Sequence, residues 1–97
     1  MIKNIEKQKT TTLKADLVDI YYKNDSKTTF DFVIWTLTSF FNKSNKESVD
    51  IATLIHKNGE GLVQHRVLKN IAKTKINKIK QVSKDAGFPL EPFYKDI

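Results

Sequence analysis

The residues of this chain whose types and spacing are best suited to chemistry are basic, and they lie in one segment. Between Gly61 and Lys84 there are seven Lys and Arg residues and no Asp or Glu, although the whole chain carries seventeen basic and eleven acidic residues. The formal net charge of +6 is therefore concentrated in this segment. A local cluster of positive charge is what an anionic partner requires, and nucleic acid is the first such partner to consider.

Helical spacing places most of these basic residues on one face. On a single helix over residues 61–86, five of them fall within about 60° of one another at about 100° per residue. Asn70 and Asn77 lie at the edge of this face, where their amides are suited to donate hydrogen bonds to phosphates or bases. The sequence therefore predicts a nucleic-acid-binding ridge, with DNA favoured over RNA, formed by Arg66, Lys69, Asn70, Lys73, Asn77, Lys80 and Lys84.

The composition of this ridge favours contact with phosphates over the reading of bases. Sixteen of the seventeen basic residues are Lys, which is a mobile point charge, whereas Arg is the usual bidentate reader of guanine. The alternative interpretation is a solvated face that keeps the protein in solution. That alternative accounts for the lysines but not for the absence of acidic residues between them.

Phe32 and Trp35 form a second candidate site. In a helix over residues 28–42, both lie opposite the apolar stripe, at about 140° to 200° from Phe30. Large aromatic residues are enriched at the centres of protein interfaces. We interpret the pair as a surface for a protein partner or for a homodimer. The alternatives are a helix that is buried on all sides and a platform for exposed bases.

No pattern of residues indicates catalysis, and we predict that the chain is not an enzyme. It contains no Cys and only two histidines, His56 and His65. The H-x-x-x-H and H-E-x-x-H spacings of metal sites do not occur. A general base would need a nucleophile or an acid within reach, and no motif supplies one. We therefore expect no catalytic residue, no metal and no cofactor.

Helices are expected to position these residues, and the first two precede the basic segment. The first covers residues 13–23, where apolar residues recur at helical spacing. The second covers residues 28–42 and begins with Thr28 and Asp31 in capping-box spacing. A strand over residues 28–41 is the alternative, because Phe, Val, Ile, Trp and Thr favour sheets.

A third helix is expected to begin at Ser44. Ser44 and Glu47 have the S-x-x-E spacing of a capping box, and this helix is expected to end near Lys57. The following Asn58 and Gly59 are typical of a C-cap.

The fourth predicted helix is long and covers residues 61–86. Its apolar positions stay within about 100° of one another on one continuous wheel, and Gly87 is placed to end it. Lys75 is a misfit inside the apolar stripe, which is explained by a side chain that reaches to solvent or by a bend near Thr74. The segment 44–61 together with the start of this helix is also compatible with a helix-turn-helix, although the second helix is too long for that motif.

These elements predict a single all-α domain over residues 1–97, a small four-helix domain whose last helix is long and basic. Residues 1–10 are expected to fray, and residues 88–97 to pack on the bundle as a tail. No apolar run approaches the roughly 20 residues of a membrane span, and the N-terminus lacks the pattern of a signal peptide. We expect a cytoplasmic protein that binds nucleic acid in an accessory or regulatory role.

The segment 76–88, followed by Tyr94, resembles the end of the last helix in immunity proteins against pediocin-like bacteriocins. The resemblance lies in the helical run up to Ala86 and Gly87, although the chain has Pro89–Leu90 where that family has Asn-Gly. It implies a basic four-helix bundle that protects a producing cell from the cytoplasm. The alternative function is therefore a small helical inhibitor or bacteriocin-immunity-type protein that acts through protein–protein contact.

Overall fold

The computed structural model describes residues 16–97, so the fraying expected for residues 1–10 lies outside it. Within residues 16–97 the chain forms three helices and one three-stranded antiparallel sheet. The prediction of an all-α four-helix domain is therefore wrong. The elements follow in the order β1 (Leu17–Lys23), α2 (Phe30–Phe41), α3 (Asn45–Asn58), β2 (Glu60–Leu68), α4 (Lys69–Asp85) and β3 (Glu91–Asp96).

The central strand β1 replaces most of the helix predicted over residues 13–23, whose first three residues lie outside the described part. Val18, Ile20 and Tyr22 alternate along β1 and are completely buried. Alternate residues of a strand point to the same face of its sheet, so these three side chains form one apolar face. Both periods find apolar residues in this short segment, because Leu17, Ile20 and Tyr21 recur at helical spacing and Val18, Ile20 and Tyr22 at strand spacing. β-branched and aromatic residues then favour the strand.

The second and third predicted helices are confirmed as α2 and α3. The N-cap of α2 is Thr29 rather than Thr28, and the Thr29 hydroxyl accepts a hydrogen bond of 3.2 Å from the Phe32 amide. The capping box predicted for α3 is present, because Ser44 and Glu47 each accept a hydrogen bond of 3.1 Å from the other's amide. Local capping signals therefore located both helix starts to within two residues.

The predicted long helix over residues 61–86 is wrong in its first part. Residues 60–68 form strand β2, which pairs with β1 along its length, and only Lys69–Asp85 are helical. At Arg66 the backbone has a φ of 57°, at an irregularity in the pairing. The helix-turn-helix alternative fails for the same reason, because its second helix would begin inside this strand.

Helix α4 runs without a break through Thr74, so no bend accommodates Lys75. The Lys75 Nζ atom instead lies 5.0 Å from the centre of the Phe41 ring, in a cation–π contact. The predicted end of the helix is confirmed at Gly87, which has a φ of 82°. The Phe88 amide donates a hydrogen bond of 2.8 Å to the Ser83 carbonyl, as in a Schellman motif.

The C-terminal tail forms a strand instead of a loose cover on a bundle. Glu91–Asp96 make up β3, which pairs antiparallel with β1 on the side opposite β2. Leu90 and Pro92 are buried, so the tail contributes to the core. The described residues contain no helix that is long and apolar enough to cross a membrane.

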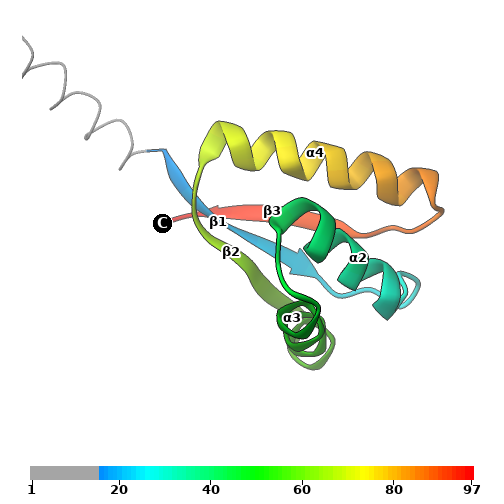
Figure 1. Cartoon of the computed structure of the whole chain (residues 1–97). Helices are drawn as coiled ribbons and strands as arrows, with labels where there is room; N and C mark the ends of the chain where they lie inside the picture. Colours follow the sequence, from blue (N-terminus) through cyan, green and yellow to red (C-terminus); the bar gives the residue numbers. More distant parts are fainter. Residues whose placement is uncertain (1–15) are drawn as a thin grey trace, which may run out of the picture.

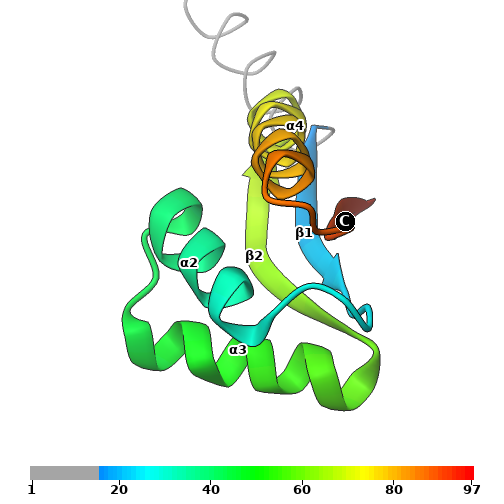
Figure 2. The same cartoon turned by 90° about the vertical axis from the view of Figure 1, so that its right-hand side faces the viewer.

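All three helices pack on the face of the sheet that carries Val18, Ile20 and Tyr22. Figure 1 shows α4 lying along the strands, and Figure 2 shows α4 end-on above them with α2 and α3 to one side. The Tyr22 hydroxyl donates a hydrogen bond of 2.8 Å to the buried Thr36 hydroxyl. The helical residues of the core are Val33, Leu37 and Phe41 from α2, Ala52 and Ile55 from α3, and Ala72, Ile76 and Ile79 from α4.

Candidate functional site

The loop between β1 and α2 is ordered by the side chain of Asp25. Its Oδ1 atom accepts hydrogen bonds from the backbone amides of Lys27, at 2.8 Å, and Thr28, at 2.6 Å. Its Oδ2 atom accepts a hydrogen bond of 2.7 Å from the Thr28 hydroxyl. An Asp that hydrogen-bonds to the backbone two and three residues later fixes a tight turn. The loop therefore has one defined shape although it lies at the surface.

Asp25 is held in its charged form. Its partial burial raises the pKa of the carboxyl, but the hydrogen bonds from Thr28 and Lys27 outweigh burial and leave that pKa below its usual value. The carboxylate is therefore ionised at neutral pH. An ionised carboxylate has about four acceptor positions, and three are occupied here, so one is left for another donor.

A second contact fixes this loop against the end of α3. The backbone amide of Asn24 donates a hydrogen bond of 2.8 Å to the carbonyl of Gly59, the residue that caps α3 in the left-handed conformation. The loop and the last turn of α3 are thereby held side by side. The start of α2, with Phe30, closes the third side.

These three segments enclose a pocket of about 310 Å³. Its apolar wall is made by Val33, Ala52 and Ile55, which all belong to the buried core. Phe30 is 45% exposed and stands at the rim. The complete lining is Asn24, Asp25, Ser26, Thr28, Phe30, Val33, Ala52, Ile55 and His56.

The arrangement suits a small ligand with an apolar body and a cationic head. The wall is uncharged and suits the apolar body, while the fixed negative charge of Asp25 beside it suits the cationic head. Within residues 16–97, the side chains of Asn24 and His56 take no part in the hydrogen bonds that order the loop. They remain as polar groups at the rim for contacts with a ligand. A few placed polar groups around an apolar cavity are typical of a binding site.

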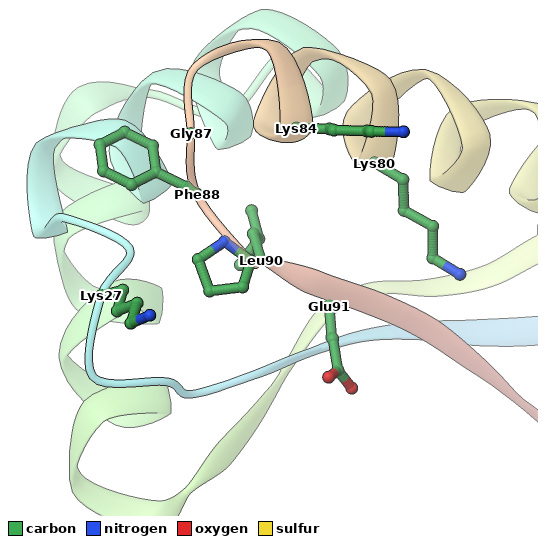
Figure 3. Close-up of a pocket in the computed structure, with 8 residues that line it drawn as sticks. Lys27, Lys80, Lys84, Gly87, Phe88, Leu90 and Glu91 are labelled. Carbon is green, nitrogen blue, oxygen red and sulfur yellow. The ribbon is translucent and has the colours of Figure 1, made fainter.

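A second hollow, which we call the lysine hollow, lies on the other side of the same loop. It has a volume of about 470 Å³. Figure 3 shows Lys27 on one side of it and Lys80 and Lys84, both from α4, on the other. The remaining lining residues are Gly87, Phe88, Pro89, Leu90 and Glu91.

The structure separates Arg66 from the rest of the predicted nucleic-acid ridge. Arg66 lies on β2, where its backbone amide donates a hydrogen bond of 2.9 Å to Asp19, and it does not share a helix with the others. The other six predicted residues do lie on α4. At the start of α4, Lys69, Asn70 and Lys73 line a shallow depression with Asp16 and Leu68. At its end, Lys80 and Lys84 line the lysine hollow.

The two residues of the predicted partner interface have different environments. Trp35 is 47% exposed, whereas Phe32 is half-buried and packs against Phe88 with ring centres 4.9 Å apart. The Phe32 and Trp35 rings contact each other at 5.6 Å. An interface at this pair stays a prediction.

Sequence reasoning missed the apolar pocket. Asn24, Asp25 and Ser26 lie just beyond the helix predicted over residues 13–23, and His56 stands in no metal-site spacing or catalytic motif. A usable signal was present in Asp25 and Thr28, because an Asp followed by Thr three residues later before a helix predicts an ordered turn. Among the described residues there is no group of three His, Cys, Asp or Glu that could hold a metal ion.

Comparison with known proteins places this chain in one family. Residues 14–92 match the family described as "ATP-dependent Clp protease adaptor protein ClpS". The adapter protein ClpS of Clostridium acetobutylicum is 38% identical over 85 residues, which cover 88% of this chain and 83% of that protein. The ClpS of Shewanella loihica is 33% identical over 85 residues, which cover 88% of this chain and 82% of that protein.

A solved structure agrees with this match. The structure of Agrobacterium tumefaciens ClpS2 bound to L-phenylalaninamide is similar with a TM-score of 0.80 and 26% identity, covering 86% of this chain and 99% of that one. These matches extend over most of the chain and concern adaptors of a protease. The predicted nucleic-acid function and nucleic-acid partner are therefore wrong, as is the resemblance to immunity proteins, whereas a role in protein–protein contact agrees with them. The chain belongs to the ClpS family of ATP-dependent Clp protease adaptors.

Proposed function

We propose that this protein is an adaptor that captures other proteins by their N-terminal residue and delivers them to an ATP-dependent Clp protease. The observation that carries the proposal is the apolar pocket with the ionised Asp25 at its rim. It is supported by the similar ClpS2, which was solved with L-phenylalaninamide bound. L-Phenylalaninamide has an aromatic side chain, a free α-amino group and a carboxamide. It therefore has the chemistry of an N-terminal phenylalanine with the start of its first peptide bond.

Each part of such a residue has a matching part in the pocket. An apolar side chain would be buried against Val33, Ala52 and Ile55, which stabilises a large apolar side chain by about 1.5–3 kcal/mol. The α-ammonium group has a usual pKa of about 7.7–8.0 and is mostly charged at neutral pH, so it would pair with Asp25. The side-chain amide of Asn24 and the ring of His56 would bind the first peptide group. An internal residue has no α-ammonium group, so only chain ends satisfy the whole site.

The size of the pocket is consistent with a single residue. At about 310 Å³ it lies near the lower end of the range of about 300–1,000 Å³ that is common for ligand sites. It is too small for a folded partner or a long peptide segment. Everything beyond the first residue would therefore remain outside it, accessible to the protease.

In this role the protein performs no chemistry of its own, and neither metal nor cofactor is needed. Bond cleavage would belong to the protease, and the adaptor would contribute binding and orientation. Because the protease is ATP-dependent, we place this function in the cytoplasm. An interface such as the one predicted at Phe32 and Trp35 would serve the contact with a protein partner.

The experiment that tests the proposal is fluorescence anisotropy with labelled peptides that begin with Phe. We expect a dissociation constant in the micromolar range, which corresponds to about −8 kcal/mol. Acetylation of the N-terminus, or Asp as the first residue, should weaken binding at least about tenfold through loss of the charged hydrogen bond or of the apolar contact. Equal binding of the acetylated and free peptides would contradict the proposal.

A further inference from the structure

The lysine hollow carries more positive charge than the structure neutralises. Within residues 16–97, the salt bridges join His65 to Asp19, Lys69 to Asp96 and Lys95 to Glu60. None of the three lysines of the hollow is among them, and Glu91 is the only acidic residue in the lining. Lys27, Lys80 and Lys84 are all exposed, so their ammonium groups are available to a partner.

The hollow also has an apolar part that α4 and the C-terminal segment build together. Phe88 packs on Phe32 of α2, and Leu90 belongs to the buried core. The Schellman motif at Gly87 fixes the chain direction between Lys84 and this segment. The hollow therefore has a fixed apolar base with exposed cationic side chains around it, an environment suited to a short anionic side chain and its methylene groups.

The apolar pocket and the lysine hollow share one loop. The backbone amide of Lys27 donates the hydrogen bond of 2.8 Å to Asp25, so the loop residue that lines the hollow is tied to the carboxylate that rims the pocket. Two residues span at most about 7 Å along an extended chain. A peptide whose α-ammonium group paired with Asp25 would have the backbone of its second and third residues within about 10 Å of that carboxylate, because the ion pair adds about 3 Å to this span. They would therefore lie within reach of the Lys27 side chain.

We propose that the lysine hollow binds acidic side chains at the second and third positions of a captured protein, so that this adaptor prefers N-terminal sequences in which an apolar residue is followed by Asp or Glu. The proposal rests on the proposed function, because the first residue must occupy the apolar pocket. Charge complementarity supports this partner: the hollow presents three lysines against one glutamate. The loop thus places a negative charge against the α-ammonium group, and the loop and α4 together place positive charges against the second and third residues of the captured chain.

The experiment measures the ratio of two affinities by fluorescence anisotropy, for peptides that begin Phe-Glu-Glu and Phe-Ala-Ala. At about 50 mM salt, we expect the acidic peptide to bind about three- to tenfold more tightly, in keeping with partly exposed ion pairs. At about 0.5 M salt the ratio should approach one, because screening weakens exposed charges. In the double variant Lys27→Glu/Lys80→Glu the ratio should fall below one. Lys46→Glu, at the far end of α3, should keep the wild-type ratio.

The outcomes separate this proposal from the proposed function. Equal and tight binding of both Phe peptides would overturn the lysine hollow and leave the pocket standing, while no binding of either would remove the basis of both. An N-acetylated Phe-Glu-Glu peptide should bind weakly. If it bound as tightly as the free peptide, the hollow would be an independent anion site and the proposal would be wrong. Circular dichroism of each variant distinguishes a changed preference from a loss of fold.

Discussion

The two hollows on either side of the loop over residues 24–28 differ in how their charge is held. On one side, Asp25 is fixed by three hydrogen bonds next to a wall of buried core residues. On the other side, Lys27, Lys80 and Lys84 are exposed and unpaired within the described residues. A fixed charge loses little freedom when a ligand binds, whereas a lysine must be ordered at that moment.

This difference separates two roles. The apolar pocket is suited to decide whether a chain end binds at all, because burial and a preformed carboxylate give large and directional contributions. The lysine hollow is suited to adjust the affinity by a smaller, salt-dependent amount. Changes in the pocket should therefore have larger effects than changes in the hollow.

The largest effect is expected when the wall of the pocket is filled. Ala52→Met places a long side chain where Ala52 now leaves space, and should weaken binding of a Phe peptide about 30- to 100-fold through loss of the apolar contact. Titration by fluorescence anisotropy measures this loss of affinity. Leu54→Met introduces the same residue on an exposed position of α3 that does not line the pocket, and serves as the control. Equal loss in both variants would show that the effect is on the helix and not on the pocket.

The next largest effect is expected from removing the charge of Asp25. Asp25→Asn keeps an acceptor for the loop amides but loses the negative charge, so a Phe peptide should bind about tenfold more weakly. Isothermal titration calorimetry would measure the loss. Asp31→Asn removes an equal charge from the first turn of α2, outside the pocket lining, and should change the affinity less than about twofold. If the Asp25→Asn variant bound the Phe peptide as tightly as the wild type, the α-ammonium group would not pair with this carboxylate.

A smaller effect is expected from pH. The pKa of Asp25 is lowered, so its hydrogen bonds order the loop above the ordinary Asp pKa of about 3.9 and weaken only as the pH falls through the lower folded-state value. Affinity should therefore persist down to about pH 4. It should fall severalfold above about pH 8, as the α-amino group of the peptide loses its proton. Anisotropy titrations across this range, repeated with Asp25→Asn, should show the alkaline fall only in the wild type.

The smallest effect is expected from Gly61→Ala. A Cβ atom at Gly61 would lie 2.8 Å from the Cγ1 atom of Ile55, which lines the pocket. The side chain of Ile55 must shift, so we expect a loss of stability of about 1–2 kcal/mol and a loss of affinity of a few fold. Thermal unfolding and anisotropy measure the two. The ratio between acidic and neutral peptides should stay the same, and a changed ratio would show that the two hollows are coupled through the core.

The sequence located those elements whose signals are local. The capping box of Ser44 and Glu47 marks the start of α3, and Gly87 marks the end of α4. Such signals succeed because a helix satisfies its backbone hydrogen bonds within itself, so a few neighbouring residues decide where it begins and ends. The apolar stripe of α2 was likewise sufficient to predict that helix, because it too is a pattern of residues close together in the sequence.

The strands could not be found in this way. Strand β2 forms because β1 supplies its hydrogen bonds from 37 to 51 residues earlier, from Lys23 opposite Glu60 to Leu17 opposite Leu68. β3 needs the same partner from the other side. No local pattern states that two distant segments will pair, and the helix predicted over residues 61–86 extended the helical period of residues 68–86 over this strand.

By itself, the sequence determined the helices α2 and α3, the end of α4, the absence of cysteine chemistry and the concentration of charge after Gly61. The tertiary structure alone decided where that charge lies, because it placed Arg66 on a strand and left Lys80 and Lys84 in one hollow with Lys27. It alone formed the pocket, whose lining comes from a loop and two helices up to thirty-two residues apart. The physical reason is that a binding site is a set of distances between side chains, and those distances are fixed by the packing of segments that are far apart in the sequence.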